Sequence, residues 1–194
     1  MPEKSERNEL RRYFRSRRRS LSAASQRNHS LNVARHLLNA GHMLRSKRIG
    51  GYWTNDGEVD LEPLLTELDY RHKQLALPVV SRRGQMSFFS YQPGAPLVVN
   101  RYDILEPAAG ARFINGRSLN LVLVPLVAFD EFGVRLGMGA GYYDRFLGSI
   151  PALLRPRIVG IAHEVQRSPD PLPLGDWDVL MDGVVTEHGW QPFH

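Results

Sequence analysis

Residues 119–129 read Leu-Asn-Leu-Val-Leu-Val-Pro-Leu-Val-Ala-Phe, and residues 135–146 read Arg-Leu-Gly-Met-Gly-Ala-Gly-Tyr-Tyr-Asp-Arg-Phe; together they decide the fold. The first run is almost continuously apolar, as in a strand that is buried on both faces of a sheet. The second run has glycine at alternate positions, where a helix or strand interior would be weakened by it. Residues 143–147 can then begin a helix. The sequence therefore predicts a strand, a glycine loop and a helix in succession.

This arrangement favours a phosphate ligand. A glycine loop lets successive backbone N–H groups face one anion, and phosphate binds well where a helix begins. Neither of two familiar motifs fits, because the third glycine comes one residue too early for G-x-G-x-x-G and no G-x-x-x-x-G-K-[ST] string occurs. A glycine-rich hairpin or tight turn is the alternative. Arg135 and Asp144, which flank the glycines, favour the binding loop.

Length and composition indicate one domain, residues 1–194, of ordinary globular type. The chain has 194 residues, 42% of them apolar, which is enough for a proper core. No apolar run approaches the length of a membrane span. The chain contains no cysteine, which excludes disulfides and thiolate chemistry and fits a cytoplasmic enzyme.

The net charge of +5 is carried by residues 1–19 alone. Leu10, Tyr13, Phe14 and Leu21 recur at helical spacing, which predicts an amphipathic helix over residues 5–21. Most arginines between Arg11 and Arg19 are expected to form its solvated face. Because the rest of the chain is neutral, a nucleic-acid surface is the less favoured reading.

Further elements follow from hydrophobic spacing and turn residues. Helices are predicted over residues 24–43 and after Asp60, which would be an N-cap, and strands over 48–53, 74–80, 86–91 and 157–163. Residues 92–115, rich in proline and glycine, are expected to form a long surface connection. His29, His36 and His42 lack metal-site spacing and are predicted to be surface or boundary histidines. The order strand, helix, strand predicts a mostly parallel sheet flanked by helices.

At residues 135–145, with Pro125 and Phe129-Asp130 before them, the pattern Arg-Leu-Gly-x-Gly-x-Gly-Tyr-Tyr-Asp-Arg resembles the signature of the 5-formyltetrahydrofolate cyclo-ligase family. The resemblance covers essentially the whole chain. It implies a single three-layer α/β/α domain, similar to the sugar-phosphate isomerase and CoA-transferase type. It also implies an ATP- and Mg²⁺-dependent ligase that converts 5-formyltetrahydrofolate to 5,10-methenyltetrahydrofolate and releases ADP and phosphate.

The resemblance also implies roles for individual residues. Those expected at ATP are Arg7, Arg11, Arg135, Leu136, Gly137, Met138, Gly139, Ala140, Gly141, Tyr142 and Tyr143. Those expected at the folate substrate are Trp53, Glu58, Met138, Gly139, Ala140, Gly141 and Tyr142. Arg135, Tyr142 and Asp144 would be catalytic, and Asp144 and Asp182 would hold Mg²⁺. Some relatives carry basic residues at the positions of Met138 and Ala140, and a lysine at that of Arg7.

Glu58 is also singled out by its place after the first predicted strand, where open α/β sheets contact ligands. A first-turn carboxylate favoured by the helix dipole is the alternative. For the whole chain, two other classes stay open at this point. One is another phosphate-binding α/β enzyme, such as a sugar-phosphate isomerase or acyl-CoA transferase. The other is a small RNA-binding protein that uses the arginine-rich helix. A monomer is expected.

Overall fold

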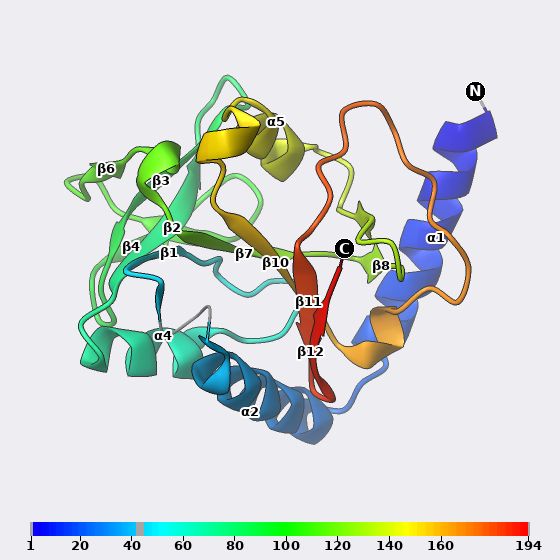
Figure 1. Cartoon of the computed structure of the whole chain (residues 1–194), viewed down its shortest axis with the longest axis horizontal. Coiled ribbons are helices and arrows are strands. Elements are labelled where there is room, and N and C mark those ends of the chain that lie inside the picture. Colours follow the sequence, from blue (N-terminus) through cyan, green and yellow to red (C-terminus); the bar gives the residue numbers. More distant parts are fainter. Residues whose placement is uncertain (1, 42–44, 194) are drawn as a thin grey trace.

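The computed structural model describes residues 2–41 and 45–193, and an eight-stranded sheet forms its centre (Figure 1). In chain order the strands of this sheet are β1 (Arg48–Gly50), β2 (Gln74–Val80), β3 (Met86–Tyr91), β6 (Phe113–Ile114), β7 (Leu121–Pro125), β10 (Arg157–Ile161), β11 (Gly183–Thr186) and β12 (Gly189–Pro192). Their spatial order is β12-β11-β10-β7-β1-β2-β3-β6. The five central strands run parallel, whereas β12, β3 and β6 pair antiparallel at the edges.

The predicted strand–helix–strand unit is present as β1, α4 (Glu62–Tyr70) and β2, and its two strands are parallel. Strand β1 also pairs parallel with β7 on its other side, so that Ile49 lies opposite both Leu75 and Leu121. The order of the strands therefore reverses between β1 and β7. In open α/β sheets the crevice at the carboxyl ends of two such strands is the usual place for a ligand.

Helices cover both faces of the sheet, which confirms the predicted α/β/α layers. Figure 1 shows α2 (Ala23–Asn39) and α4 below the sheet and α5 (Tyr142–Gly148) above it. Under α2 and α4, Leu37 and Leu64 pack with Ile49 in one core cluster. On the other face, Leu147 packs with Phe88 in a second cluster. Along the residues the structure describes, no helix is both long and apolar enough to cross a membrane.

Four predicted boundaries are wrong. The strand predicted over residues 48–53 ends at Gly50. The apolar run 119–129 is split into β7 and β8 (Ala128–Phe129), because Pro125 has no N–H to donate and the chain turns after it. Residues 92–115 are not a plain connection, since β4 (Leu97–Val99) pairs with β5 (Leu105–Pro107) and β6 extends the main sheet. The segment 157–163 is a strand only to Ile161.

The helix ends also differ from prediction. Leu61 occupies the N-cap position of α4, and Asp60 instead accepts a hydrogen bond from the Glu62 N–H at 2.9 Å. The second helix, predicted to reach Met43, ends at Asn39. Met43 and His42 lie outside the described residues.

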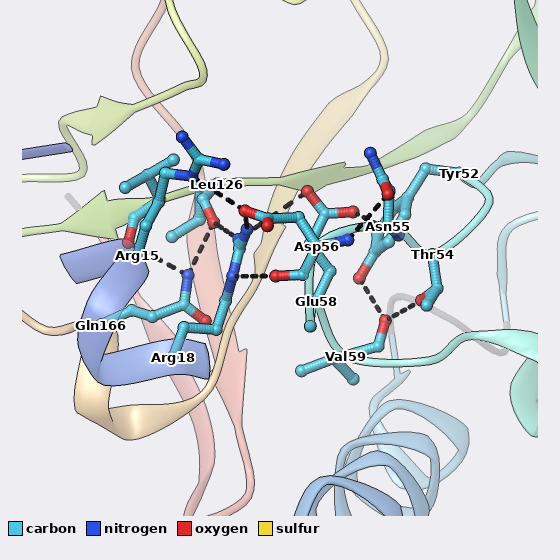
Figure 2. Close-up of polar contacts among 12 residues, drawn as sticks. Arg15, Arg18, Tyr52, Thr54, Asn55, Asp56, Glu58, Val59, Leu126 and Gln166 are labelled. Carbon is cyan, nitrogen blue, oxygen red and sulfur yellow. Dashed lines mark hydrogen bonds and ion pairs between the residues drawn. The ribbon is translucent and has the colours of Figure 1, made fainter. Parts of the chain in front are cut away.

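Helix α1 (Pro2–Arg19) docks on the sheet through one buried arginine (Figure 2). The Arg18 side chain is fully buried and donates to three acceptors: Asp56 O at 3.0 Å, Asp56 Oδ2 at 2.6 Å and Leu126 O at 3.1 Å. The expectation of a solvated face is therefore wrong for Arg18. Because Asp56 follows β1 and Leu126 follows β7, this arginine ties α1 to both strands at the reversal point.

Asp56 also accepts hydrogen bonds from two further arginines of α1. Arg15 Nε donates to Asp56 Oδ2 at 2.9 Å, and Arg19 Nε donates to Oδ1 at 2.5 Å. Burial alone would favour the protonated acid, but hydrogen bonds from Arg15, Arg19 and Arg18 lower the pKa of Asp56 to about 2. The backbone at Asp56 has φ of +54°, so that the turn presents this carboxylate to the helix.

Replacing Asp56 should destabilise the protein strongly, because the buried Arg18 would lose its nearest counter-charge and keep only Glu58, at 3.8 Å. We expect Asp56→Asn to lower the free energy of unfolding by about 3 kcal/mol in urea denaturation at pH 7. Asp170→Asn, on the exposed surface, is the matched control and should change it by less than about 0.5 kcal/mol. Equal effects of the two variants would show that the Arg18 ion pair does not hold α1.

Candidate functional site

The glycine loop joins β9 (Arg135–Leu136) to α5, and arginines hold its carbonyl groups. Arg11 Nε donates to Gly137 O at 2.9 Å, and an Arg145 guanidinium N–H donates to Ala140 O at 2.8 Å. Gly139 and Gly141 have φ of +100° and +66°, which only glycine adopts readily. Within the described part of the chain, none of the amide groups from Gly137 to Gly141 donates a hydrogen bond to the protein. The loop thus keeps a row of N–H donors for a ligand, as predicted for an anion site.

A cavity of about 1030 Å³ opens in front of this loop. It is bounded by α1, the glycine loop, α5 and the segment before β11. The predicted ATP residues that it brings together are Arg7, Arg11, Arg135, Gly137, Gly139 and Gly141. Asp144 lines the same cavity, and so do Arg145 and the largely exposed Trp177, which the sequence analysis missed. The excess of arginine over carboxylate in its wall suits a polyphosphate.

Arg135 is tied to the protein more tightly than expected. Its side chain is only 4% exposed and donates to Asp144 Oδ1 at 2.5 Å and to the carbonyl oxygen of Val179. Asp144 Oδ1 also accepts the Val179 N–H at 3.2 Å. Arg135 therefore orients Asp144 and holds the segment around Val179 against α5. A direct contact of Arg135 with ATP stays a prediction.

Arg7 and Arg11 approach the cavity from α1. Arg7 forms a two-pronged ion pair with Asp178, at 2.9 and 3.3 Å, and Asp178 also accepts the Gly175 N–H. Partial burial, and then the charge of Arg7, lowers the pKa of Arg11. Two close guanidinium groups would gain from a bound anion. Their positions confirm that α1 supplies one wall of this cavity.

Asp182 is placed elsewhere. Its Oδ2 accepts the Ile158 N–H at 2.6 Å, and its own N–H donates to Ile158 O at 2.8 Å, so its side chain completes the hydrogen-bond ladder where β10 begins. Among the described residues that line the cavity, Asp144 and Asp178 are the carboxylates and Asp182 is absent. The structure therefore does not bring the predicted pair Asp144 and Asp182 into this cavity.

Glu58 lies at the reversal point, beside Arg18 (Figure 2). Its Oε2 accepts the Asn55 N–H at 3.1 Å, and its Oε1 is 3.8 Å from an Arg18 guanidinium nitrogen. Burial raises the pKa of Glu58 to about 7, although Arg18 opposes the shift. A buried carboxyl group whose pKa is raised to about 7 beside a specific charged partner is typical of a functional site. This favours a binding role over the alternative of a first-turn carboxylate.

Tyr143 is the second residue of α5, directly after the glycine loop. Its hydroxyl group is buried and, across the described residues, has no hydrogen-bond partner. Burial, and then the charge of Glu58, raises the pKa of Tyr143, whereas Arg135 lowers it, so the hydroxyl lies within the influence of both. A buried hydroxyl without a partner costs stability and is well placed to bond a ligand.

Tyr142 faces a pair of side chains that the sequence analysis assigned to a plain connection. Its hydroxyl group lies 2.5 Å from that of Tyr102 and accepts a hydrogen bond from Arg101 at 2.8 Å. These bonds, that of Tyr102 first, lower the pKa of Tyr142. No sequence motif marks Arg101 or Tyr102, because they reach the loop only through the β4–β5 hairpin.

The other residues predicted to bind the substrates differ in their exposure and in their contacts. Leu136 is buried in a core cluster with Phe14, so its side chain faces away from the cavity. Met138 is 49% exposed, and Ala140 is exposed as well. Trp53 packs edge to face against Tyr91, with ring centroids 6.0 Å apart. The contribution of Trp53 to substrate binding stays a prediction.

The α/β fold and the arginine-lined cavity are typical of an enzyme that acts on a phosphate-bearing substrate. The family model described as 5-formyltetrahydrofolate cyclo-ligase family matches residues 3–187. The chain belongs to the 5-formyltetrahydrofolate cyclo-ligase family, and its activity is the ATP-dependent conversion of 5-formyltetrahydrofolate to 5,10-methenyltetrahydrofolate. Membership decides against the isomerase, transferase and RNA-binding alternatives.

Comparison with individual relatives supports this family assignment. The chain is 35% identical over 176 residues to the 5-formyltetrahydrofolate cyclo-ligase of Escherichia coli strain K12, covering 89% of this chain and 96% of the relative. It is 33% identical over 189 residues to that of Haemophilus influenzae, with 93% and 97% coverage. The solved structure of Aquifex aeolicus 5,10-methenyltetrahydrofolate synthetase has a TM-score of 0.83 and 34% identity, covering 96% of this chain and 92% of that one. The fold is shared too with the Mycoplasma pneumoniae synthetase, at a TM-score of 0.75 and 21% identity, with 93% and 98% coverage.

Gly137 offers a test of the loop that leaves the fold intact. A Cβ atom added there would meet no other atom within 4 Å, and its backbone has no positive φ. We expect Gly137→Ala to keep the parental melting temperature while raising the KM for ATP by about tenfold, because the methyl group would displace the phosphate from its N–H donors. The control is Gly41→Ala, which also has open space around it and should change neither quantity. An unchanged KM for ATP in Gly137→Ala would mean that the phosphate lies elsewhere.

Glu58 should give the stability of the ligand-free protein a distinct pH dependence. Because its pKa is raised from 4.5 to about 7, the folded protein holds a proton between these values that the unfolded chain has released. This contribution stabilises the fold at low pH and is lost as the pH rises through about 7. Glu58→Gln should therefore gain stability relative to the parent between pH 5 and pH 8, as measured by chemical denaturation. A constant difference between the two proteins would contradict the shifted pKa.

Proposed function

We propose that the glycine-loop cavity binds the triphosphate of ATP and that the region around Glu58, at the carboxyl ends of β1 and β7, binds the reduced folate. The observation that carries this proposal is the state of the loop. The carbonyl groups of Gly137 and Ala140 are held by Arg11 and Arg145, whereas the amide groups of the loop have no acceptor among the described residues. Tyr143 follows the loop and is influenced by the charge of Glu58, so it would lie where the two substrates meet.

The chemistry follows from the poor leaving ability of a formyl oxygen. That oxygen attacks the γ-phosphorus of ATP, the bond to the β-phosphate oxygen breaks, and ADP leaves. N10 of the folate then attacks the activated formyl carbon, loses its proton, and closes the ring as phosphate departs. Catalysis of this kind depends on positioning and on stabilising charge.

Different residues of the chain would position the substrates and stabilise the charge that develops. The loop amides, with Arg7 and Arg11, would balance the charge that develops on the phosphate oxygens. Glu58 would accept hydrogen bonds from the pterin N–H groups. The Tyr143 hydroxyl would gain the partner that it lacks, and Tyr142 would orient the formyl group. Arg135 acts through Asp144, whose position it fixes.

Asp144 fits the Mg²⁺ that the family resemblance implies. Both of its hydrogen bonds use Oδ1, which leaves Oδ2 without a protein donor among the described residues. Mg²⁺ commonly takes one or two carboxylates and completes its shell with water and substrate phosphates. When bound, it would supply positive charge to the transferred phosphate. A second ligand role for Asp182 remains part of the proposal without support from its position.

We also propose that the protein works as a monomer in the cytoplasm. The absence of cysteine agrees with a reducing compartment.

Asp144→Asn separates a metal role from a structural one. The amide oxygen can still accept from Arg135 and Val179, but the nearly buried Arg135 loses the charge paired with it, so the melting temperature without nucleotide should fall moderately. Because the negative charge is lost, we expect kcat for methenyl product to fall by about a hundredfold and the Mg²⁺ concentration for half-maximal rate to rise. A spectroscopic assay of methenyltetrahydrofolate formation across a Mg²⁺ titration measures both.

Asp182→Asn is the companion variant in the same assay. A parental Mg²⁺ requirement would remove Asp182 from the metal site, in agreement with its bond to Ile158. If Asp144→Asn lost thermal stability but kept the parental Mg²⁺ requirement, Asp144 would be a structural residue and the metal proposal would be wrong.

A further inference from the structure

Two histidines and a glutamate from distant parts of the chain lie close together. His29 Nδ1 lies 3.0 Å from His163 Nδ1 and 3.3 Å from Glu187 Oε1. The three atoms all lie within 4.8 Å of one another, and no other such group of three occurs among the described residues. The spacing of the histidines along the chain predicted a boundary role for His29, but its partners come from distant segments.

The fold explains why these residues meet. His163 follows β10 and Glu187 follows β11, and these two strands are parallel neighbours, so both side chains emerge at the same edge of the sheet. His29 reaches them from α2, which lies beside the turn between β11 and β12 (Figure 1). Helix α2 and the segments that directly follow β10 and β11 thus supply one ligand atom each.

The surrounding hydrogen bonds aim two of these atoms toward the centre of the cluster. The His163 Nε2–H donates to Gly57 O at 3.2 Å, which fixes the tautomer with a lone pair on Nδ1. Glu187 Oε2 accepts the Glu164 N–H at 3.0 Å, which leaves Oε1 turned to His29. Such bonds from the second nitrogen of an imidazole and the second oxygen of a carboxylate are typical around metal ligands.

The distances suit a small dication. Zinc bonds of about 2.0–2.2 Å at tetrahedral angles separate ligand atoms by roughly 3.3 Å. The two contacts of His29, at 3.0 and 3.3 Å, are close to this value. His163 is buried and the Glu187 side chain is 8% exposed, whereas that of His29 is 20% exposed and leaves an approach from solvent.

From this geometry we propose that His29, His163 and Glu187 form a binding site for one Zn²⁺ ion, with a water molecule as its fourth ligand. Two imidazoles and one carboxylate favour zinc over Mg²⁺, which prefers oxygen ligands. The site is distinct from the proposed Mg²⁺ position at Asp144. Because His163 also holds the carbonyl group of Gly57, an ion there would stiffen the turn that carries Asp56 and Glu58.

The test uses the full chain, freed of metal with a chelator and kept in millimolar Mg²⁺ without folate or nucleotide. Isothermal titration with Zn²⁺ should give one site per chain in the parent. Co²⁺ as a probe should give the intense visible absorption of a four-coordinate ion. Zn²⁺ should also raise the melting temperature of the parent. None of these readouts depends on the proposed substrate sites.

His29→Gln is the main variant, because this partly exposed side chain on α2 can change without opening the core. We expect its Kd for Zn²⁺ to rise at least about tenfold, with loss of the Co²⁺ absorption and of the zinc-dependent rise in melting temperature. Glu187→Gln, whose amide can still accept from Glu164, should behave in the same way. The control is His72→Asn, an exposed histidine at φ of +58° that asparagine tolerates, and it should bind zinc as the parent does.

The proposal is overturned if the parent binds less than one Zn²⁺ per chain, or if both His29→Gln and Glu187→Gln bind it as tightly as the parent. In either case a proton shared between the two imidazoles would account for the 3.0 Å contact.

Discussion

The rest of the structure depends on the burial of the Arg18 guanidinium group at the end of β1 and β7. A buried charge is costly unless its hydrogen bonds and its counter-charge are all present. Asp56 and Leu126 provide them, and they come from the two strands between which the order of the sheet reverses. The ion pair therefore fixes the orientation and position of α1 relative to the sheet. Arg7 and Arg11 stand on the same helix, so their reach into the cavity follows from it.

The fold was predictable where the signal is local. Strands 74–80 and 86–91 have the predicted bounds, because each is an apolar run closed by turn residues. The short strands within residues 92–115 were missed, since two- or three-residue strands owe their existence to partners that are not adjacent in sequence. The burial of Arg18 was missed for a related reason. Its position on the helix does not reveal that a carboxylate will arrive from the loop after β1.

In the candidate site, too, local motifs were predictable, whereas contacts between distant segments were not. The glycine loop and Asp144 are contiguous, so a single sequence motif identifies both of them. Asp182 came from family resemblance alone, and its side chain is used by the ladder of β10 instead. The histidine pair could not be found from spacing, because 134 residues separate His29 from His163. Tyr102 and Arg101 carry no signature, and only the β4–β5 hairpin brings them to Tyr142.

The ion pair between Arg7 and Asp178 joins residues that are 171 positions apart, and this has a consequence for synthesis on the ribosome. Helix α1 emerges first, but the segment that completes its wall of the cavity is translated almost last. Until residues 127–136 have been made, the apolar face around Phe14 has nothing to cover it, and the many arginines keep the helix soluble. A nascent chain that ends before Asp178 contains β1, β2, β7 and β10 but lacks β11 and part of the cavity wall. The proposed ATP site is therefore complete only after translation is nearly finished.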